Sequence, residues 1–297
     1  SEVELTSERH KFGEGVGKTR GRRPMTSADV RGEVRDRLAI ALDVDDLVAA
    51  TRLARQVRPW CGVAKVGLEL FGAAGPEAVI GLVEDGWRVF LDLKLHDIPT
   101  TVGRAARVLG GLGAAYVNFH VQGGEAMLRA GVEGLTEGAA AAGLPAPVAL
   151  GVTVLTSETG APAGELGRRV GLAAAAGCGG VVCAAPDLPE VHQAGPGLVT
   201  VVPGTRPPGS SRHDQGRVST PAEAVAAGAD LLVLGRVVTA STDPAAAAAA
   251  VAGSVAEALT RSRAGGGAPA GAEAAGNDTA GGGGGAPAGA AKSPGTG

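Results

Sequence analysis

The sequence is poor in aromatic residues and has no strong excess of charge of either sign, and each shortage excludes a class of protein. Only 2% of its 297 residues are aromatic, so the core of a chain that is 44% hydrophobic must be built mainly from Val, Leu and Ala. The formal net charge is -3, which is not the polycation that sequence-independent nucleic-acid binding requires. No apolar run reaches the length of about 18 residues and the hydrophobicity that a membrane span needs.

The three cysteines and five histidines form no metal-binding or redox pattern. Cys61, Cys178 and Cys183 make no CxxC pair and lie in or beside apolar segments, so we interpret them as small buried side chains in a reducing compartment. The histidines are too scattered in the sequence to suggest a zinc cluster. No GxGxxG motif follows the first strand-like segment, which disfavours a dinucleotide-binding Rossmann fold.

The two ends of the chain differ in composition from the middle. Residues 1–35 are polar, Gly-rich and basic in patches, without helical or strand periodicity, and we interpret them as a flexible extension with Met25 as an alternative start. Its KTRGRR run is a candidate nucleic-acid or targeting patch, but a solvated tail is favoured, and no apolar signal segment accompanies it. Residues 263–297 are low-complexity Gly, Ala and Pro, which cannot offset chain entropy by burial. The predicted globular domain is residues 36–262.

Between the two ends, short apolar runs alternate with segments of helical character. Several helical segments open with Asp, Thr or Pro and close with Gly, as helix caps do. Eight such repeats over about 220 residues match an α/β (β/α)8 TIM barrel better than an open doubly wound sheet. The predicted strands are 38–42, 62–67, 88–93, 115–120, 147–152, 179–184, 198–202 and 230–235.

Charged residues follow the carboxyl ends of these strands, where the βα loops of a barrel converge. Asp43 ends the first strand, Lys65 lies near the end of the second, and Asp92 and Lys94 end the third. Asp92 and Lys94 are two positions apart, so both side chains are predicted to face the barrel interior while the neighbouring leucines face outward. One Asp–Lys pair is more often structural than catalytic. A set that also includes Lys65 and Asp97 indicates an active site, because burying several charges costs several kcal/mol each.

A second group of residues has the chemistry of a phosphate site. Gly235 allows a close backbone approach, the turn that follows presents free N–H groups to an anion, and Arg236 adds a fixed cation. Ahead of them, residues 203–218 form a long Gly/Pro/Ser-rich loop of a length that is more often functional than not.

The run DLKLHDIPTT, with its three charged positions, resembles the DxKxxDI signature of the orotidine 5'-phosphate decarboxylase family. AIALDV, AKVGLELFG, VNFHVQGG, VTVLTS, GVVCAA, VPGTRPPGSSRHDQGR and LVLGRVVTASTDP resemble further family segments in the same order, over residues 37–260. The resemblance implies decarboxylation of orotidine 5'-phosphate to UMP, the last step of de novo pyrimidine synthesis, without a metal or organic cofactor. It implies a cytoplasmic homodimer that binds neither nucleic acid nor membrane.

The resemblance also implies a role for each site residue. Lys94 would stabilise and then protonate the C6 carbanion, between Asp92 of its own chain and Asp97 of the partner subunit, with Lys65 extending the charge network. The implied binding roles belong to Asp43 and Lys65 at the ribose, Thr156 and Ser157 at the pyrimidine, Thr101 across the dimer interface, and Arg206, Gln215, Gly235 and Arg236 at the phosphate. Thr156 and Ser157 also fit a simple helix cap.

Two alternatives stay open. One is a Mg²⁺-dependent sugar-phosphate decarboxylase or aldolase of the same suprafamily, which shares the DxKxxD spacing. The other is a non-catalytic module that binds nucleotide phosphates, which the intact set of charged residues argues against. The sequence departs from the family pattern at Thr100 and Thr205, and neither position carries a charge.

Overall fold

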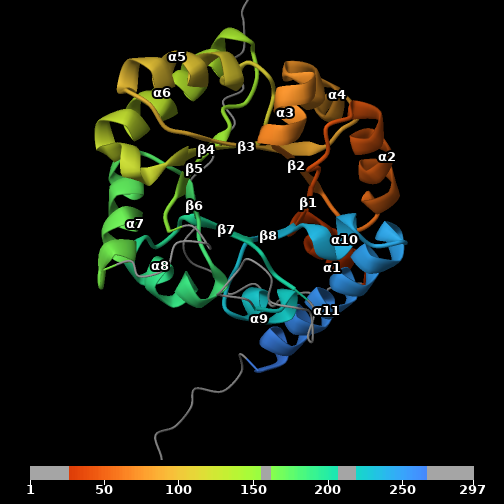
Figure 1. Ribbon diagram of the computed structural model, residues 1–297. Helices are drawn as coiled ribbons and strands as arrows, with labels where there is room; N and C mark the ends of the chain where they lie inside the picture. Colours follow the sequence, from red (N-terminus) through yellow and green to blue (C-terminus); the bar gives the residue numbers. More distant parts are fainter. Residues whose placement is uncertain (1–26, 155–161, 207–218, 266–297) are drawn as a thin grey trace, which may run out of the picture.

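The computed structural model describes residues 27–154, 162–206 and 219–265, and these form a closed barrel (Figure 1). All eight strands are parallel and paired in sequence order, with β1 next to both β2 and β8. The predicted (β/α)8 barrel is confirmed, and each predicted strand overlaps an observed one. The strands are β1 Leu38–Ala41, β2 Val63–Gly67, β3 Arg88–Leu95, β4 Tyr116–His120, β5 Val148–Val152, β6 Gly180–Val182, β7 Val199–Pro203 and β8 Leu231–Leu234.

Helices surround the barrel as an outer ring (Figure 1). Two of the helix starts show the predicted capping chemistry: the Asp46 side chain accepts hydrogen bonds from the first turn of α2, and Thr220 forms a capping box with Glu223 at α9. The helices are α1 Ser27–Asp36, α2 Leu47–Val57, α3 Leu68–Ala74, α4 Pro76–Glu84, α5 Pro99–Gly110, α6 Gly124–Ala141, α7 Glu165–Ala175, α8 Leu188–Ala194, α9 Pro221–Ala226, α10 Arg236–Thr239 and α11 Pro244–Gly265, with 3-10 turns η1 Val121–Gly123 and η2 Ala185–Asp187.

The strands bury both of their faces, because one face lines the barrel and the other lies under the helices. Alternate residues of a strand therefore enter two separate apolar clusters. The cluster inside the barrel contains Ala39, Ala41, Val63, Phe90 and Val233. The outer cluster, between strands and helices, contains Leu38, Ile40, Ala64, Val66 and Leu91. The core is mainly aliphatic, as the low aromatic content predicts.

The predicted flexible extension of residues 1–35 is wrong for residues 27–35, which belong to helix α1. Val34 of this helix is buried in the outer cluster, and Val30 packs against that cluster. Only these two apolar residues, one helical turn apart, mark the segment as amphipathic, and the polar residues around them hide the pattern.

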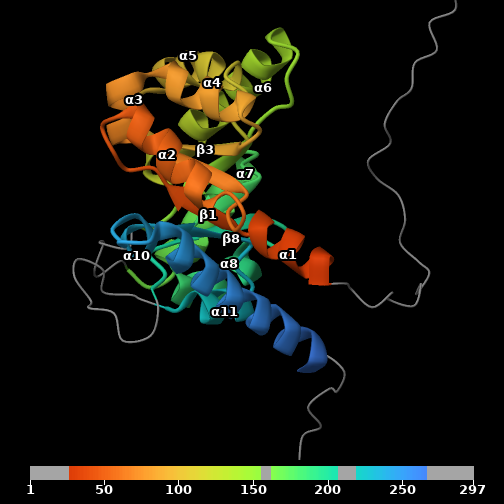
Figure 2. The same cartoon turned by 90° about the vertical axis from the view of Figure 1, so that its right-hand side faces the viewer.

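Helix α1 lies beside the last helix of the barrel, α11. Glu33 of α1 forms an ion pair with Arg263 of α11. Figure 2 shows both helices extending to the side of the barrel away from α10. Because α11 continues to Gly265, the helix also extends past residue 263, where the sequence predicted the tail to begin. The remaining residues of both predicted extensions lie outside the described part of the chain.

All three cysteines are free and buried, as predicted. Burial raises the pKa of both Cys61 and Cys178 to about 12, so their thiols stay protonated at neutral pH. Among the described helices, none is both long enough and apolar enough to cross a membrane.

Candidate active site

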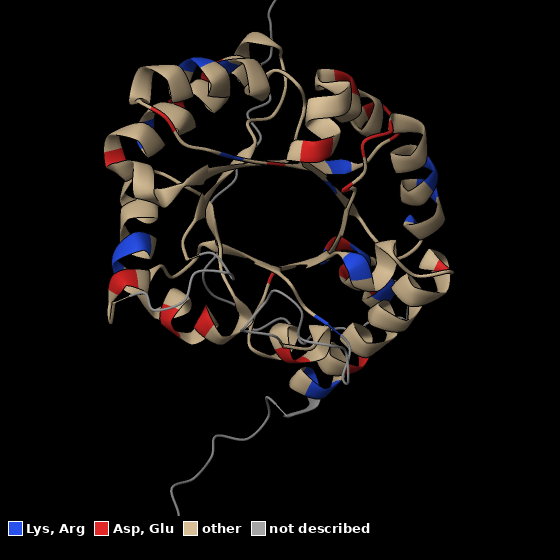
Figure 3. Ribbon diagram, in the orientation of Figure 1, with Lys and Arg blue, Asp and Glu red and all other residues tan. Residues whose placement is uncertain are grey.

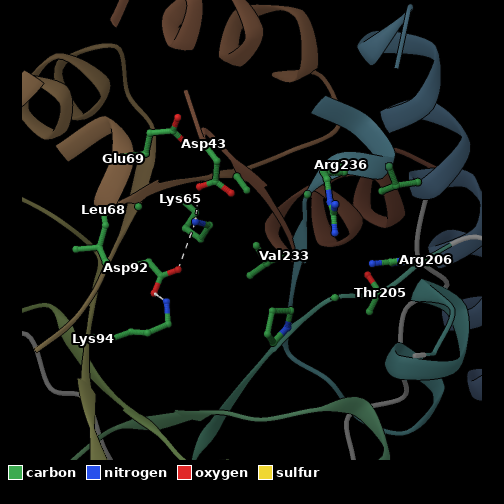
Figure 4. A pocket seen from close by; sticks show the side chains of 16 residues that line it. Asp43, Lys65, Leu68, Glu69, Asp92, Lys94, Thr205, Arg206, Val233 and Arg236 are labelled. Atoms are coloured by element: carbon green, nitrogen blue, oxygen red, sulfur yellow. Dashed lines mark hydrogen bonds and ion pairs between the residues drawn. The ribbon is translucent and has the colours of Figure 1, made fainter. Parts of the chain in front are cut away.

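A pocket of about 850 Å³ opens at the carboxyl ends of the strands, with charged residues on opposite sides (Figure 4). Asp43, Lys65, Asp92 and Lys94 lie on one side, near the ends of β1, β2 and β3. Arg236, at the start of α10, lies on the other side. Figure 3 shows why this cluster is unusual in the molecule: most charged residues gather on the outer helices, and the strands around the barrel axis carry few.

The first side of the pocket is a chain of alternating charges. Lys94 Nζ lies 2.6 Å from Asp92 Oδ1, and Lys65 Nζ lies 3.3 Å from Asp92 Oδ2. Lys65 Nζ also donates to Asp43 Oδ1 at 2.8 Å. Asp92 therefore holds one ammonium group on each of its oxygens. The Lys65 side chain is only 9% exposed and that of Lys94 is 35% exposed, so Lys94 is the more accessible lysine.

The surroundings of Asp92 keep it ionised. Burial by itself would raise the pKa of this carboxyl group, but the positive charges of Lys65 and Lys94 and hydrogen bonds from Lys94 and Asn118 outweigh it and hold the pKa below its ordinary value. A negative charge therefore lies between the two lysine ammonium groups.

The backbone at Lys94 departs from the regular strand that the sequence predicts. Lys94 has φ of 52°, and among the described residues it is the sole non-glycine residue with a positive φ. The pairing of β3 with β4 shifts at the same place, between Leu91 and Leu95. Asp92 and Lys94 do meet, but simple strand alternation does not bring them together, because a bulge lies between Asp92 and the end of β3.

Sequence reasoning missed Asn118 of β4, which contacts both catalytic candidates. Its Nδ2 donates to Asp92 Oδ1 at 2.7 Å, and its Oδ1 accepts from the backbone N–H of Lys94 at 2.7 Å. Asn118 is fully buried. The one available signal is an amide side chain between the apolar Val117 and Phe119 of the strand segment YVNFH, where a buried polar group needs partners.

Gly67 is a second residue that sequence reasoning missed. It ends β2 opposite Asp92, and a Cβ atom at this position would lie 3.0 Å from both Asp43 Oδ1 and Lys65 Nζ. That distance is tighter than an ordinary carbon contact. The absence of a side chain at Gly67 therefore leaves the space in which Lys65 and Asp43 pair.

The second side of the pocket is basic and polar. Arg206, Gly235 and Arg236 all line it, as the sequence predicts, and Gly204 turns the chain there with φ of 77°. Thr205 also lines the pocket; its side chain is buried, and its Oγ1 has no hydrogen-bond partner within the described segments. Figure 4 shows Thr205, Arg206 and Arg236 across the pocket from Lys65 and Asp92.

A smaller and more apolar cavity of about 180 Å³ adjoins the main pocket inside the barrel mouth. The two cavities share Lys65, Asp92 and Lys94, so the charged chain lies at their boundary. The rest of the small cavity is mainly apolar, lined by Phe90, Val152, Val154, Val182, Cys183, Pro203 and Val233. A flat ring placed over this cavity would contact carbon on one side and the charged groups at its edge.

The remaining predicted site residues do not join this cluster. Asp97 and Thr101 are exposed at the start of α5 and do not line the pocket, and Asp97 Oδ1 accepts from the N–H of Ile98 at 2.6 Å. Thr156, Ser157 and Gln215 lie outside the described residues. Within the described segments, no group of three or more His, Cys, Asp or Glu residues is arranged to hold a metal ion.

Fold and site together define the class of protein: a (β/α)8-barrel enzyme with its charged site at the carboxyl ends of the strands. A sequence profile of the Orotidine 5'-phosphate decarboxylase / HUMPS family matches residues 36–251. Orotidine 5'-phosphate decarboxylase of Moorella thermoacetica is 48% identical over 233 residues, which cover 74% of this chain and 92% of that protein. The enzyme of the same name from Anaeromyxobacter dehalogenans is 47% identical over 226 residues, covering 72% and 96%.

A solved structure leads to the same family. The crystal structure of orotidine 5'-phosphate decarboxylase from Lactobacillus acidophilus superposes with a TM-score of 0.63 at 31% identity, covering 73% of this chain and 98% of that one. The chain therefore belongs to the orotidine 5'-phosphate decarboxylase / HUMPS family.

Proposed function

We propose that the protein decarboxylates orotidine 5'-phosphate to UMP, a step of pyrimidine biosynthesis. The observation that carries this proposal is the chain of alternating charges from Asp43 through Lys65 and Asp92 to Lys94 at the mouth of the barrel. The family profile also covers HUMPS proteins, but relatives of this chain at 44% to 48% identity bear the name orotidine 5'-phosphate decarboxylase.

The reaction presents one main difficulty. Loss of CO2 from C6 of the pyrimidine leaves an electron pair in the plane of the ring, where it cannot delocalise into the ring carbonyl groups. A fixed positive charge beside C6 stabilises this pair as it develops, and a proton donor at the same place completes the reaction.

In the proposal, Lys94 supplies both the charge and the proton. It is the more exposed lysine of the pair, and its ammonium group is held 2.6 Å from Asp92 Oδ1 at the boundary of the two cavities. The C6–CO2 bond breaks, CO2 leaves, and a proton moves from Lys94 Nζ to C6. The neutral amine then regains a proton from solvent.

Asp92 has two tasks in this scheme. Its negative charge holds the Lys94 ammonium group in place through the 2.6 Å ion pair. It also faces the carboxylate of the bound substrate, and this repulsion ends when CO2 leaves. Asp43 and Lys65, joined at 2.8 Å on the other side of Asp92, hold the ribose hydroxyl groups and extend the charge network.

The rest of the substrate spans the pocket. We assign the 5'-phosphate to the basic side, where Arg236 and Arg206 supply cations and Gly235 allows a close backbone approach. The pyrimidine ring covers the small apolar cavity. Thr156 and Ser157 at the pyrimidine and Gln215 at the phosphate complete the assignment, and their support is the family resemblance of their segments.

The active enzyme in this proposal is a cytoplasmic homodimer. Asp97 and Thr101 act in the partner's pocket, which fits their exposure and the fact that neither lines the pocket of its own chain. The loop that carries them also exposes an apolar side chain: Ile98 is 66% exposed, and burial in an interface would remove this surface from water. The three free, buried cysteines fit a reducing cytoplasm.

Turnover of orotidine 5'-phosphate by the purified protein tests the function. We expect loss of the orotate absorbance with formation of UMP, and an unchanged rate in excess chelator. Turnover that stops in chelator favours the Mg²⁺-dependent sugar-phosphate alternative. UMP binding without any turnover favours the non-catalytic module.

A mixing experiment tests the shared site. Lys94→Ala and Asp97→Ala should each be inactive, but in a mixed dimer one site contains both an intact Lys94 and an intact Asp97. With equal amounts and free exchange, half of the dimers are mixed and each has one whole site, so about a quarter of wild-type sites should return. Verified mixed dimers without this recovery would show that Asp97 acts within its own chain.

A further inference from the structure

The ladder between β3 and β4 breaks at one point, and a single β4 residue faces the break. Leu91 pairs with Val117 and Leu95 pairs with Phe119, so three β3 residues face Asn118 alone. A bulge of this kind leaves backbone groups without their usual ladder partners. At this bulge, a buried side chain rather than a strand supplies one of the missing partners.

That partner is Asn118 Oδ1, which accepts the backbone N–H of Lys94 at 2.7 Å. Lys94 needs such support, because its φ of 52° lies in the left-handed region that a side chain with a Cβ atom rarely adopts. A strained backbone persists only where surrounding contacts hold it. If Lys94 relaxed to an ordinary strand conformation, its Cα–Cβ bond would change direction and its ammonium group would move.

The other end of the same amide contacts the carboxylate. Asn118 Nδ2 donates to Asp92 Oδ1 at 2.7 Å, and this oxygen also accepts from Lys94 Nζ at 2.6 Å. The two contacts fix the orientation of the amide. A flipped side chain would place its oxygen against the carboxylate and its NH2 group against the backbone N–H of Lys94.

We propose that Asn118 is a positioning residue of this enzyme: it holds the backbone of Lys94 and the carboxylate of Asp92 in the geometry that directs the Lys94 ammonium group at the reacting carbon. The inference rests on the proposed decarboxylation. It assigns to β4 a part in the reaction that neither the DxKxxDI motif nor the phosphate site contains.

A merely structural amide would affect stability alone, and Thr200 supplies the control for that case. Thr200 is as fully buried as Asn118, and its Oγ1 donates to Asp230 Oδ2 at 2.9 Å. It lies on β7 and does not line the active-site pocket. Thr200→Val removes this hydrogen bond and the one that Thr200 Oγ1 accepts from the Asp230 N–H at 3.1 Å, so it should lower the melting temperature while kcat stays at the wild-type value.

Asn118→Ala removes both hydrogen bonds. We expect kcat to fall about 100-fold, because small displacements of catalytic groups have effects of that size, while the Kd of UMP changes less than about threefold. A fall in melting temperature comparable with that of Thr200→Val, but with wild-type kcat, would overturn the inference.

Asn118→Asp gives a sharper test, because the new side chain has the same shape. When its carboxyl group is protonated, it can still accept from the Lys94 N–H and donate to Asp92. When it is ionised, it repels Asp92 at hydrogen-bond distance. Two carboxyl groups at such a short distance share one proton, and the pKa of the pair is raised. The ammonium groups of Lys94 and Lys65, which also face Asp92, oppose this rise.

The ratio of kcat for Asn118→Asp to kcat for wild type should therefore rise as the pH falls, whereas the same ratio for Thr200→Val should stay flat. A flat ratio for Asn118→Asp in a folded protein would contradict the inference. Wild type measured in the same series keeps the two proposals distinct: a wild type without turnover rejects the decarboxylation, and an active wild type with unaffected Asn118 variants rejects only the role of Asn118.

Discussion

The two ends of the barrel use the same kinds of charged residue and arrange them differently. At the carboxyl end, Asp92 is 13% exposed and lies 2.6 Å from one ammonium group and 3.3 Å from another. At the amino end, the ion pairs Arg37–Glu33 and Arg88–Asp36 are 3.5 Å and 3.9 Å long, and their side chains are 22% to 61% exposed. Both ends also have a sizeable pocket, about 850 Å³ and about 700 Å³.

The comparison teaches that burial, not the number of charges, the length of the ion pairs or the presence of a hollow, separates the two ends. Asp92 is 13% exposed and Lys65 is 9% exposed, whereas Glu33, which pairs with both Arg37 and Arg263, is 22% exposed. Exposed, hydrated pairs contribute little to stability and impose little geometry on a ligand. A buried carboxylate held between two lysines interacts strongly with both, because the surroundings screen the charges weakly, and the same weak screening strengthens their interaction with a substrate. Substitutions at the carboxyl end should therefore change turnover or ligand binding, whereas substitutions at the amino end should change only stability, and by a small amount.

Among the substitutions that compare the two ends, the largest effect is expected for Asp92→Asn, which leaves two lysines without the charge between them. We expect kcat to fall about 10²- to 10³-fold, as when a preorganised electrostatic contact is removed. Because the pKa of Asp92 is lowered from its ordinary 3.8, its ionised form stabilises the fold above that pH, and this contribution is lost as the pH falls through the lowered value.

Denaturant unfolding at a series of pH values measures the stability part of this prediction. The difference in unfolding free energy between wild type and Asp92→Asn should be largest above about pH 4 and should shrink on acidification. A difference that stays constant down to about pH 2 would mean that the ion pairs of Asp92 with its two lysines do not stabilise the fold.

Arg236→Ala should show the next largest effect, confined to the phosphate. Arg236 is exposed, and loss of its charge-assisted contact with the phosphate should weaken binding of UMP by about 1.5–3 kcal/mol and leave binding of uridine nearly unchanged. Calorimetric titration of both ligands measures the two values side by side. Equal losses for UMP and uridine would place the phosphate elsewhere.

Gly67→Ala should act indirectly on the charge chain. The new Cβ atom would lie 3.0 Å from both Lys65 Nζ and Asp43 Oδ1, so the pair must move by a few tenths of an ångström. We expect kcat/KM to fall about tenfold, which corresponds to the lower range of overpacking costs. Gly72→Ala in α3 is the matched control, because nothing lies within 4 Å of its new methyl group. Similar losses in both variants would exclude the steric explanation.

Asp36→Asn, at the amino end, should have the smallest effect. It removes the 3.9 Å ion pair with Arg88 between two largely exposed side chains. Thermal unfolding should shift by no more than about 0.5 kcal/mol, and turnover should stay at the wild-type value. A clear loss of turnover would make the amino end part of the active site and remove the contrast between the two ends.

Much of this contrast could be predicted from the sequence, because it depends on local patterns. Strands buried on both faces appear as short apolar runs. Charged residues near the ends of such runs, such as Asp43 and Lys65, must lie at the carboxyl end of a parallel barrel. The basic side of the pocket could be predicted for a similar reason, since Gly235 and Arg236 follow a strand directly.

The parts that could not be predicted depend on contacts between distant segments. Nothing in the residue type of Lys94 signals a positive φ, because the bulge exists only in the pairing of β3 with β4. Asn118 is 24 residues from Lys94, and its amide can contact Lys94 only when β3 and β4 are adjacent. Helix α1 could not be predicted because its buried Val34 and half-buried Val30 stand in a polar segment and pack only once α11 is in place.

The central claim is that Lys94 at the carboxyl end performs the chemistry, and one comparison tests it most directly. UMP formation and UMP binding should be measured on the same preparation of Lys94→Ala, beside wild type. The account predicts that kcat falls at least about 10³-fold while the Kd of UMP stays within about tenfold, because the product lacks the group on which Lys94 acts. A folded Lys94→Ala protein that binds UMP and keeps more than about a tenth of wild-type kcat would contradict it.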